Sequence, residues 1–287
     1  MNAHMLAINA GSIFSLPDVV FRINDLIDSS EATNHELEQT VLHDPAITAK
    51  ILKFANSAYF GFSGQIETVS RAISLIGHKE LQNLVIASSV TSTFKGISSD
   101  LVDMESFWHH SVNCGVVARL LAVNIESRER FFIAGLLHGV GKLIFFSQYP
   151  DESAKILSIK DEGEQAVIKA ERDIFGFTYS ELSAELLKQW RLPPSIWKMV
   201  ESQFAPVMEE ESKDDARILS ISVNIANQIQ SGASKSMCLD EITATYKLDD
   251  LSCLGLTAEV IESAMVVADL QVMEMLSVIR PESTIAS

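Results

Sequence analysis

The sequence predicts an all-α fold, and three observations support this class. Apolar residues recur at intervals of three and four along most of the chain, which is the spacing of one face of a helix. Stretches in which apolar and polar residues alternate are few, so strands are not expected. The chain has 287 residues and is 47% hydrophobic, which is enough for a large core in one or two domains.

The front part of the chain, residues 16–103, is expected to form a helical subdomain that follows an N-terminal leader or helix at 1–15. Apolar spacing predicts four helices here, over residues 19–27, 37–42, 69–76 and 80–94. A fifth helix is predicted to begin at Pro45, because Asp44 can accept hydrogen bonds from the first free N–H groups and proline suits the first helical position. Gly77 is expected to end the helix over residues 69–76.

The rear part, residues 104–207, is expected to form a second helical subdomain. The predicted helices cover 105–123, 131–138, parts of 150–175, 179–190 and 195–204. Residues 208–287 are expected to add an acidic loop and C-terminal helices that pack on this rear core. The acidic run Met208–Asp215 is interpreted as a solvated loop rather than a docking tail. The apolar stripe along 257–279 is expected to pack internally, with dimerisation as the alternative use.

Charge disfavours two classes of partner. The chain has 22 Lys and Arg against 38 Asp and Glu, a formal net charge of −16. Nucleic-acid binding rests on clustered cations, and an anionic membrane surface attracts cations too, so neither partner is expected. The helix pair around Gly77 superficially resembles a helix-turn-helix, but its second helix carries no cation between Lys79 and Lys95.

The cysteines and the N-terminus indicate a cytoplasmic setting. Cys114, Cys238 and Cys253 are far apart and form no CxxC pair, so neither a zinc knuckle nor a disulfide framework is predicted. The first residues lack the basic start and long apolar core of a secretory signal. No apolar run reaches the length of roughly 20 residues that a membrane span needs.

The most apolar stretch, Phe131–Phe146, has a single histidine at its centre. His138 is followed by Gly139 and Gly141 and then by Lys142. We interpret the stretch as a buried helix, a turn and the start of a second buried helix. A buried imidazole without a partner costs about 1–3 kcal/mol, so the groups that face His138 are the functional question.

Several separated motifs now resemble a known family. The sequence FWHHS at Phe107–Ser111, followed by GLLHGVGK at Gly135–Lys142, resembles the HD superfamily of metal-dependent phosphohydrolases, whose second motif reads LLHDIGK. Further segments resemble the HD-related output domain family, HDOD, and they are Leu16-Pro17, His43–Thr48, Ala55–Ala58, Ala72–Gly77 and Trp190–Pro193. The resemblance runs from Leu16 to Phe204. It implies a helical front subdomain packed on an HD-domain-like helical bundle, with the HD chemistry usually lost.

The resemblance can be carried over to individual residues. The first histidine of the HD site corresponds to His110 and the second to His138, but the aspartate that should follow is Gly139. The late aspartate corresponds to Asn227, and Tyr179 stands near the place of an extra histidine of relatives that cleave cyclic dinucleotides. Two neutral imidazoles remain, whereas a catalytic zinc site normally has three protein ligands.

We therefore expect a vestigial pocket with no catalytic residue, metal or cofactor. Its residues are His110, His138, Gly139, Lys142 and Asn227. The two histidines are expected to hydrogen-bond each other, Asn227, the backbone or water. Lys142 is expected to cover the helix end with its side chain, with a phosphate contact as the alternative.

The resemblance implies a regulatory module of a bacterial signalling pathway. We expect a non-catalytic output module that binds protein partners in the cytoplasm, with no nucleic-acid or membrane partner and with homo-oligomerisation left open. The first alternative is a divergent HD-type metal-dependent phosphohydrolase of nucleotides or cyclic dinucleotides. The second is a ligand sensor that uses the vestigial pocket.

Overall fold

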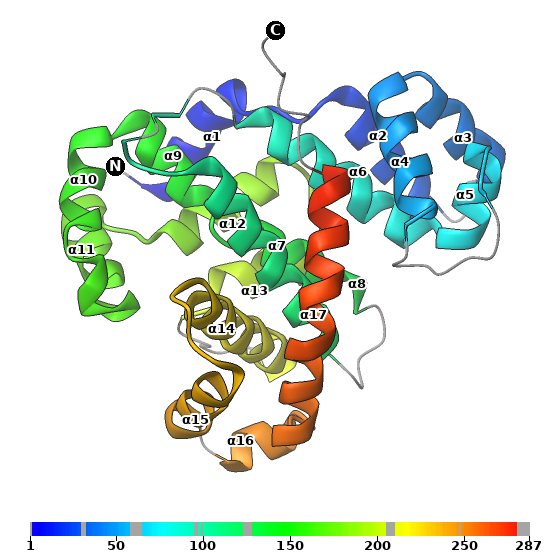
Figure 1. The fold of residues 1–287 in the computed structure, drawn as a ribbon. Coiled ribbons are helices and arrows are strands. Elements are labelled where there is room, and N and C mark those ends of the chain that lie inside the picture. The colour runs from blue at the N-terminus through cyan, green and yellow to red at the C-terminus, as the bar shows by residue number, and fades with distance from the viewer. Residues whose placement is uncertain are drawn as a thin grey trace, which may run out of the picture. The chain divides into compact units, whose positions relative to one another are not determined.

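The protein is built from helices throughout the part that the computed structural model describes, which is residues 2–29, 33–57, 65–94, 97–98, 100–122, 128–204, 210–246 and 248–279 (Figure 1). The predicted all-α class is confirmed. The helices are α1 Ala3–Ile13, α2 Asp18–Asp28, α3 Asn34–Leu42, α4 Pro45–Ala55, α5 Val69–Ile76, α6 His78–Thr93, α7 Met104–Leu121, α8 Glu129–Leu137, α9 Val140–Gln148, α10 Pro150–Leu157, α11 Glu164–Phe175, α12 Tyr179–Gln189, α13 Pro194–Glu201, α14 Glu210–Gln230, α15 Lys235–Thr245, α16 Leu248–Cys253 and α17 Ala258–Ile279. Ala58, Lys95, Gly96 and Met208, which the sequence interpretation uses, lie outside the described residues.

Local signals in the sequence place several helix ends. Asp44 Oδ1 accepts hydrogen bonds from the backbone N–H groups of Ala46 at 2.9 Å and Ile47 at 3.0 Å, and α4 begins at Pro45 as predicted. The helix α5 ends at Gly77, also as predicted. Thr178 begins α12 with a reciprocal pair of hydrogen bonds to Glu181, a capping box.

The chain divides into two units, and neither is one continuous stretch of sequence. The larger unit comprises residues 1–15 and 95–268, and the smaller comprises residues 16–94 and 269–287. The domains expected from the sequence, 1–15, 16–103, 104–207 and 208–287, are continuous stretches. The N-terminal helix α1 therefore belongs to the same unit as α7–α14, and the last part of the chain belongs with the front helices.

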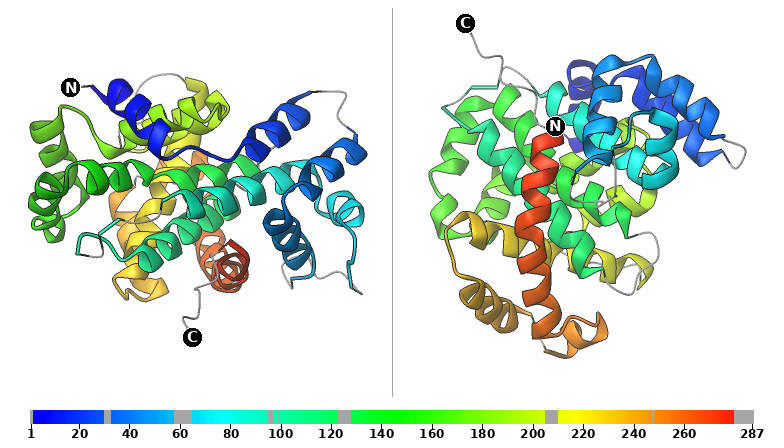
Figure 2. Two further views of the ribbon diagram at one scale, coloured as in Figure 1. Left: turned by 90° about the horizontal axis from the view of Figure 1, so that it is seen from above. Right: turned by 45° about the vertical axis from the view of Figure 1, so that its right-hand side comes forward.

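In the smaller unit, hydrogen bonds tie the end of α17 to the front helices. Thr91 Oγ1 on α6 donates to the carbonyl of Ile279 at 3.0 Å, and Lys53 Nζ on α4 donates to the carbonyl of Ser277. A helix of 22 residues is about 33 Å long, which lets α17 contribute its first half to one unit and its last half to the other. Figure 2 shows α17 as one uninterrupted helix. The predicted internal stripe is buried, and it comprises Ile261, Ala264, Ala268, Val272, Met275 and Ile279.

In the larger unit, two glycines let α7 and α8 approach each other closely. A Cβ atom placed on Gly135 would lie 2.5 Å from Gly115 Cα, and one on Gly115 would lie 2.6 Å from the carbonyl oxygen of Phe132. The helix α1 packs on α12, where Trp190 Nε1 donates to the carbonyl of Phe14 at 3.0 Å. This packing fixes α8 against α7 and supports the region from which the candidate site is built.

Two parts of the rear half differ from the expectations. The acidic run is helical from Glu210 onward, because it forms the start of α14. Asp214 Oδ1 lies 3.6 Å from a guanidinium nitrogen of Arg217, and Asp215 Oδ2 lies 2.7 Å from one of Arg130. These cations offset part of the acidic charge. The helices α15 and α16 were not predicted. In α15 only Cys238 and Ile242 are buried. Two buried positions are too few to give the apolar periodicity that predicts a helix from sequence.

The most apolar stretch is part of the protein core. Within the described residues, Glu129–Gln148 is long and apolar enough to cross a membrane by length and composition alone. However, 78% of its most apolar part is buried inside the fold. The stretch is also not one helix, because α8 ends at Leu137 and α9 begins at Val140. The core helix of a globular domain passes the same test.

Candidate functional site

His138 lies between α8 and α9 and is buried. Its side chain is held by the turn from which it projects, because Nδ1 lies 2.6 Å from the carbonyl oxygen of Gly135. The His138 residue is only 2% exposed, and burial lowers the pKa of this imidazole to about 4 although the Gly135 carbonyl acts in the opposite direction. The side chain is therefore neutral at physiological pH.

His110 projects from α7 toward His138. The two ring centroids are 5.4 Å apart, so the structure brings the two histidines together as the resemblance implied. Burial, followed by the nearby His138 and Lys142, lowers the pKa of His110 to about 3, and a hydrogen bond with the backbone of Ala226 on α14 acts against this shift. Both imidazoles are thus neutral bases.

Gly139 and Lys142 each lie against an aromatic ring. A Cβ atom on Gly139 would lie 3.8 Å from the ring of Phe107. Lys142 Nζ lies 3.7 Å from Glu164 Oε1 and 3.9 Å from the centroid of the Tyr179 ring, which is a cation–π geometry. The lysine is therefore paired with Glu164 and Tyr179 rather than only covering the helix end.

Asn227, which the resemblance places in the pocket, is an exposed residue of α14. The adjacent residue, Ala226, is the one whose backbone contacts His110. Successive residues on an α-helix differ by about 100° in direction, so a neighbour in sequence faces another side. Of the partners expected for the two histidines, the described contacts are with the backbone, at Gly135 for His138 and at Ala226 for His110.

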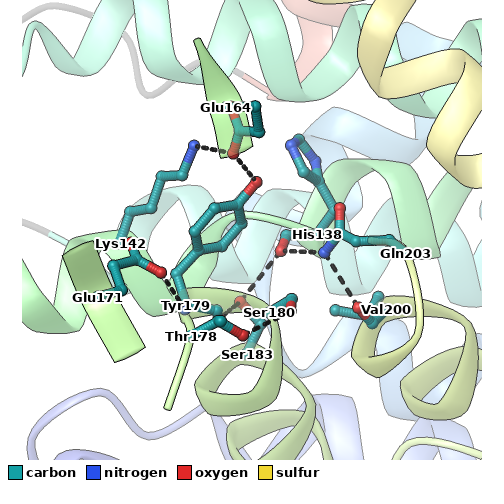
Figure 3. A network of polar contacts seen from close by, with 10 residues as sticks. All are labelled: His138, Lys142, Glu164, Glu171, Thr178, Tyr179, Ser180, Ser183, Val200 and Gln203. Atoms are coloured by element: carbon teal, nitrogen blue, oxygen red, sulfur yellow. Dashed lines mark hydrogen bonds and ion pairs between the residues drawn. The ribbon is translucent and has the colours of Figure 1, made fainter. Parts of the chain in front are cut away.

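The polar network in Figure 3 contains residues that the sequence did not single out as functional. Tyr179 Oη donates to Glu164 Oε1 at 2.8 Å, and the Tyr179 backbone N–H donates to Glu171 Oε2 at 2.7 Å. Gln203 Nε2 donates to the carbonyl of His138 at 3.2 Å. The resemblance pointed to the position of Tyr179, but no motif or spacing marks Glu164, Glu171 or Gln203 in advance.

Burial changes the acidity of this network. It raises the pKa of Glu171 to about 7, partly offset by the Tyr179 N–H, and it raises the pKa of Tyr179. Glu171 is only 2% exposed, whereas Glu164 is shared between Lys142 and Tyr179. The site therefore contains a buried carboxyl group that titrates near neutral pH.

The donor set does not fit the metal that the HD resemblance implies. His110 and His138 supply two neutral nitrogens, but Gly139 replaces the carboxylate beside His138 and faces the Phe107 ring. Across the described ranges, no group of three His, Cys, Asp or Glu side chains is arranged to hold a metal ion. Hard and borderline divalent cations in HD-type chemistry need carboxylate ligands, and the two imidazoles alone do not supply them.

Comparisons with known proteins agree with the motifs. The model of the family described as HDOD domain matches residues 13–206. An uncharacterized protein of Treponema pallidum (strain Nichols) is 24% identical over 197 residues, which is 68% of this chain and 38% of that protein. The match thus spans well under half of that relative's length.

Solved structures from three bacteria share the fold. A candidate phosphohydrolase from Shewanella amazonensis SB2B has a TM-score of 0.78 at 22% identity, with 96% of this chain and 98% of that one covered. A candidate signal transduction protein from Marinobacter aquaeolei VT8 has a TM-score of 0.71 at 20% identity, covering 93% and 59%. An HDOD domain protein of unknown function from Geobacter sulfurreducens has a TM-score of 0.71 at 17% identity, covering 96% of each chain. At these identities the likeness shows the fold alone.

Proposed function

Because the chain belongs to the HDOD domain family, we propose that it is a non-catalytic regulatory module that acts in a bacterial signalling pathway by binding protein partners. The proposal has two parts. The first is that the HD site no longer performs hydrolysis. The second is that the module works through contacts with other proteins in the cytoplasm, where the three free cysteines stay reduced.

The chemistry at His138 carries the first part. The position that holds an aspartate in the HD motif is Gly139, and the Phe107 ring lies 3.8 Å from where its Cβ would be. An aromatic ring at that place cannot replace a carboxylate as a ligand or as a counter-charge for a divalent cation. The two remaining imidazoles are neutral and engaged with backbone groups, and His138 is buried while His110 is partly buried.

An activity assay tests this part. We expect no hydrolysis of cyclic dinucleotides or nucleoside triphosphates above blank, with manganese or magnesium present. An active HD phosphohydrolase in the same assay is the positive control. Turnover that survives repurification and disappears in His110→Ala would overturn the proposal, because it would show that the histidine pair still supports a reaction.

An interaction assay tests the second part. The chain is used as bait in cell extract of the source organism, and a captured protein is then purified and titrated against the bait. We expect one saturable complex that His110→Ala leaves intact, because the histidines are not needed for a surface contact. If the bait binds none of the purified candidates saturably, a role through protein partners is contradicted.

A further inference from the structure

The cluster formed by His110, His138 and Gln203 holds hydrogen-bond acceptors whose orientation is fixed by the backbone. His138 Nδ1 faces the carbonyl oxygen of Gly135 at 2.6 Å. A carbonyl only accepts, so Nδ1 carries the proton of the neutral ring and Nε2 holds the lone pair. The tautomer of His138 is thus assigned from its neighbour.

The same reasoning applies to His110. Its neutral ring makes a hydrogen bond with the backbone of Ala226 that favours the protonated ring, which means that a ring N–H donates to the Ala226 carbonyl. His110 Nδ1 is buried and has no hydrogen-bond partner among the described residues, so the donor is Nε2. Nδ1 is then a buried lone pair without a donor.

Gln203 supplies the third acceptor. Its residue is fully buried, and its Nε2 donates to the carbonyls of His138 at 3.2 Å and Val200 at 3.0 Å. Turning the amide over would place its oxygen against two carbonyl oxygens, so the assignment is fixed by its contacts. Oε1 of Gln203 is buried and has no donor within the described part of the chain.

Donors close to the cluster are already engaged. The Tyr179 hydroxyl donates to Glu164, and the Ser183 hydroxyl lies 2.8 Å from the Tyr179 carbonyl and 3.1 Å from the His138 carbonyl. His110 Nδ1 and Gln203 Oε1 are therefore two buried acceptors without a donor among the described residues, and both residues adjoin His138, whose Nε2 carries a third lone pair. Buried polar groups are nearly always paired, so an outside molecule is expected to supply the missing hydrogens.

We infer that this cluster binds a small planar molecule that donates N–H groups, of the class of cyclic amides, imides and amino-heterocycles. The inference goes beyond the proposed regulatory role by giving the module an input, and its failure would leave partner binding untouched. An uncharged ligand is favoured, because the site is desolvated and the Lys142 ammonium is already paired with Glu164 at 3.7 Å, which leaves no single charge to balance an ion.

Aromatic neighbours favour a planar ligand. The Phe107 ring lies against Gly139, next to His138, and Phe204 follows Gln203 and packs edge-on against Tyr179 with centroids 5.4 Å apart. Both phenylalanines are partly exposed, so their rings remain accessible to a flat molecule. Aromatic faces pair well with flat, polar heterocycles.

The test uses uracil, cytosine and adenine as probes in calorimetric titrations of the full chain. Each probe has a control in which methyl groups replace the N–H hydrogens, such as dimethyluracil, so that the control cannot donate to the buried acceptors. We expect at least one probe to bind. Its methylated control should bind at least about tenfold more weakly, because losing even one hydrogen bond to a buried acceptor has an effect of that size. Absence of binding by all three probes, which is the result if only water fills the cluster, would overturn the inference, as would equal binding of the methylated control.

A matched pair of variants locates the site. His110→Phe removes the lone pair, whereas His109→Phe makes the same change one residue earlier on α7. We expect about tenfold weaker binding only in His110→Phe. Equal losses in both variants would place the ligand elsewhere. If His110→Phe does not fold, the methylated probes on the unaltered chain still decide.

The tautomers give an independent readout. Proton–nitrogen NMR of the imidazole rings is expected to show Nδ1 of His110 without a proton in the free protein, and to show its resonance moving when a probe binds. A protonated Nδ1 in the free protein would overturn the inference, because the ring would then offer a donor rather than an acceptor.

Discussion

At the scale of single residues, Glu171 is the group whose ionisation should govern stability near neutral pH. It is 2% exposed, and burial raises its pKa to about 7, with Glu164 and Glu181 adding to the rise and Lys142 and the Tyr179 N–H opposing it. The pKa is higher in the folded than in the unfolded chain. Its stabilising effect is therefore complete below an unfolded pKa of about 4.5 and is lost as pH rises through about 7.

We expect Glu171→Gln to remove this dependence. The amide oxygen can still accept the Tyr179 N–H, but it carries no charge. The variant should gain stability relative to the unaltered protein as pH rises from about 5 to 8, by an amount on the order of 3 kcal/mol at most. Urea unfolding at a series of pH values measures this. Parallel pH profiles for the two proteins would show that Glu171 is not the titrating group.

Gly141 is a second residue whose identity the packing dictates. A Cβ atom there would lie 2.2 Å from the Tyr179 carbonyl oxygen and 2.9 Å from Ser183 Oγ, the atom that accepts the Gly141 N–H. Gly141→Ala should therefore destabilise the fold by about 1–3 kcal/mol. At Gly11 in α1 the nearest atom to a Cβ is 3.8 Å away, so Gly11→Ala should be neutral or stabilising by up to about 1 kcal/mol. Thermal unfolding of both variants checks the contrast, and equal melting temperatures would contradict it.

At the scale of helices, α1 is a structural part of the larger unit. Leu6 and Phe14 are buried, Phe14 accepts the indole N–H of Trp190, and His4 Nδ1 lies 2.8 Å from Glu185 Oε2. The sequence left open whether residues 1–15 form a leader or a helix, since eleven residues without a strong apolar stripe carry little signal. Its packing on α12 decides the matter.

Deleting residues 2–15 should therefore destabilise the larger unit. Leu6 and Phe14 each contribute about 1.5–3 kcal/mol by burial, and the deletion also removes the acceptor of Trp190 Nε1. We expect a lower melting temperature and a red-shifted tryptophan emission as Trp190 becomes hydrated. The conservative control is His4→Gln, which alters only an exposed contact. An unchanged melting temperature in the deletion variant would show that α1 does not support the fold.

At the scale of the whole molecule, the charge decides which large partners are disfavoured. The net charge of −16 opposes association with a polyanion, and residues Glu80–Thr91 of the helix that would read DNA are buried. We expect no binding to random duplex DNA at physiological salt. A gel-shift assay with a known DNA-binding protein as control measures this. A salt-sensitive shift at micromolar concentration would refute the prediction.

Features that depend on neighbours along the chain can be predicted from the sequence alone. The helical class, the start of α4 at Asp44-Pro45, the end of α5 at Gly77 and the burial of the stretch around His138 all follow from local capping, periodicity and apolar content. The family follows from separated motifs in order. The net charge is likewise a property of composition alone.

Which distant side chains meet depends on how the helices pack. The tertiary structure placed Glu164 and Gln203 near the histidines and left Asn227 exposed, although Asn227 is adjacent in sequence to the residue that contacts His110. It also divided α17 between two units. The physical reason is that local signals fix where a helix begins and ends, whereas the direction in which a given residue points depends on how whole helices pack, and a rotation of about 100° separates one residue from the next.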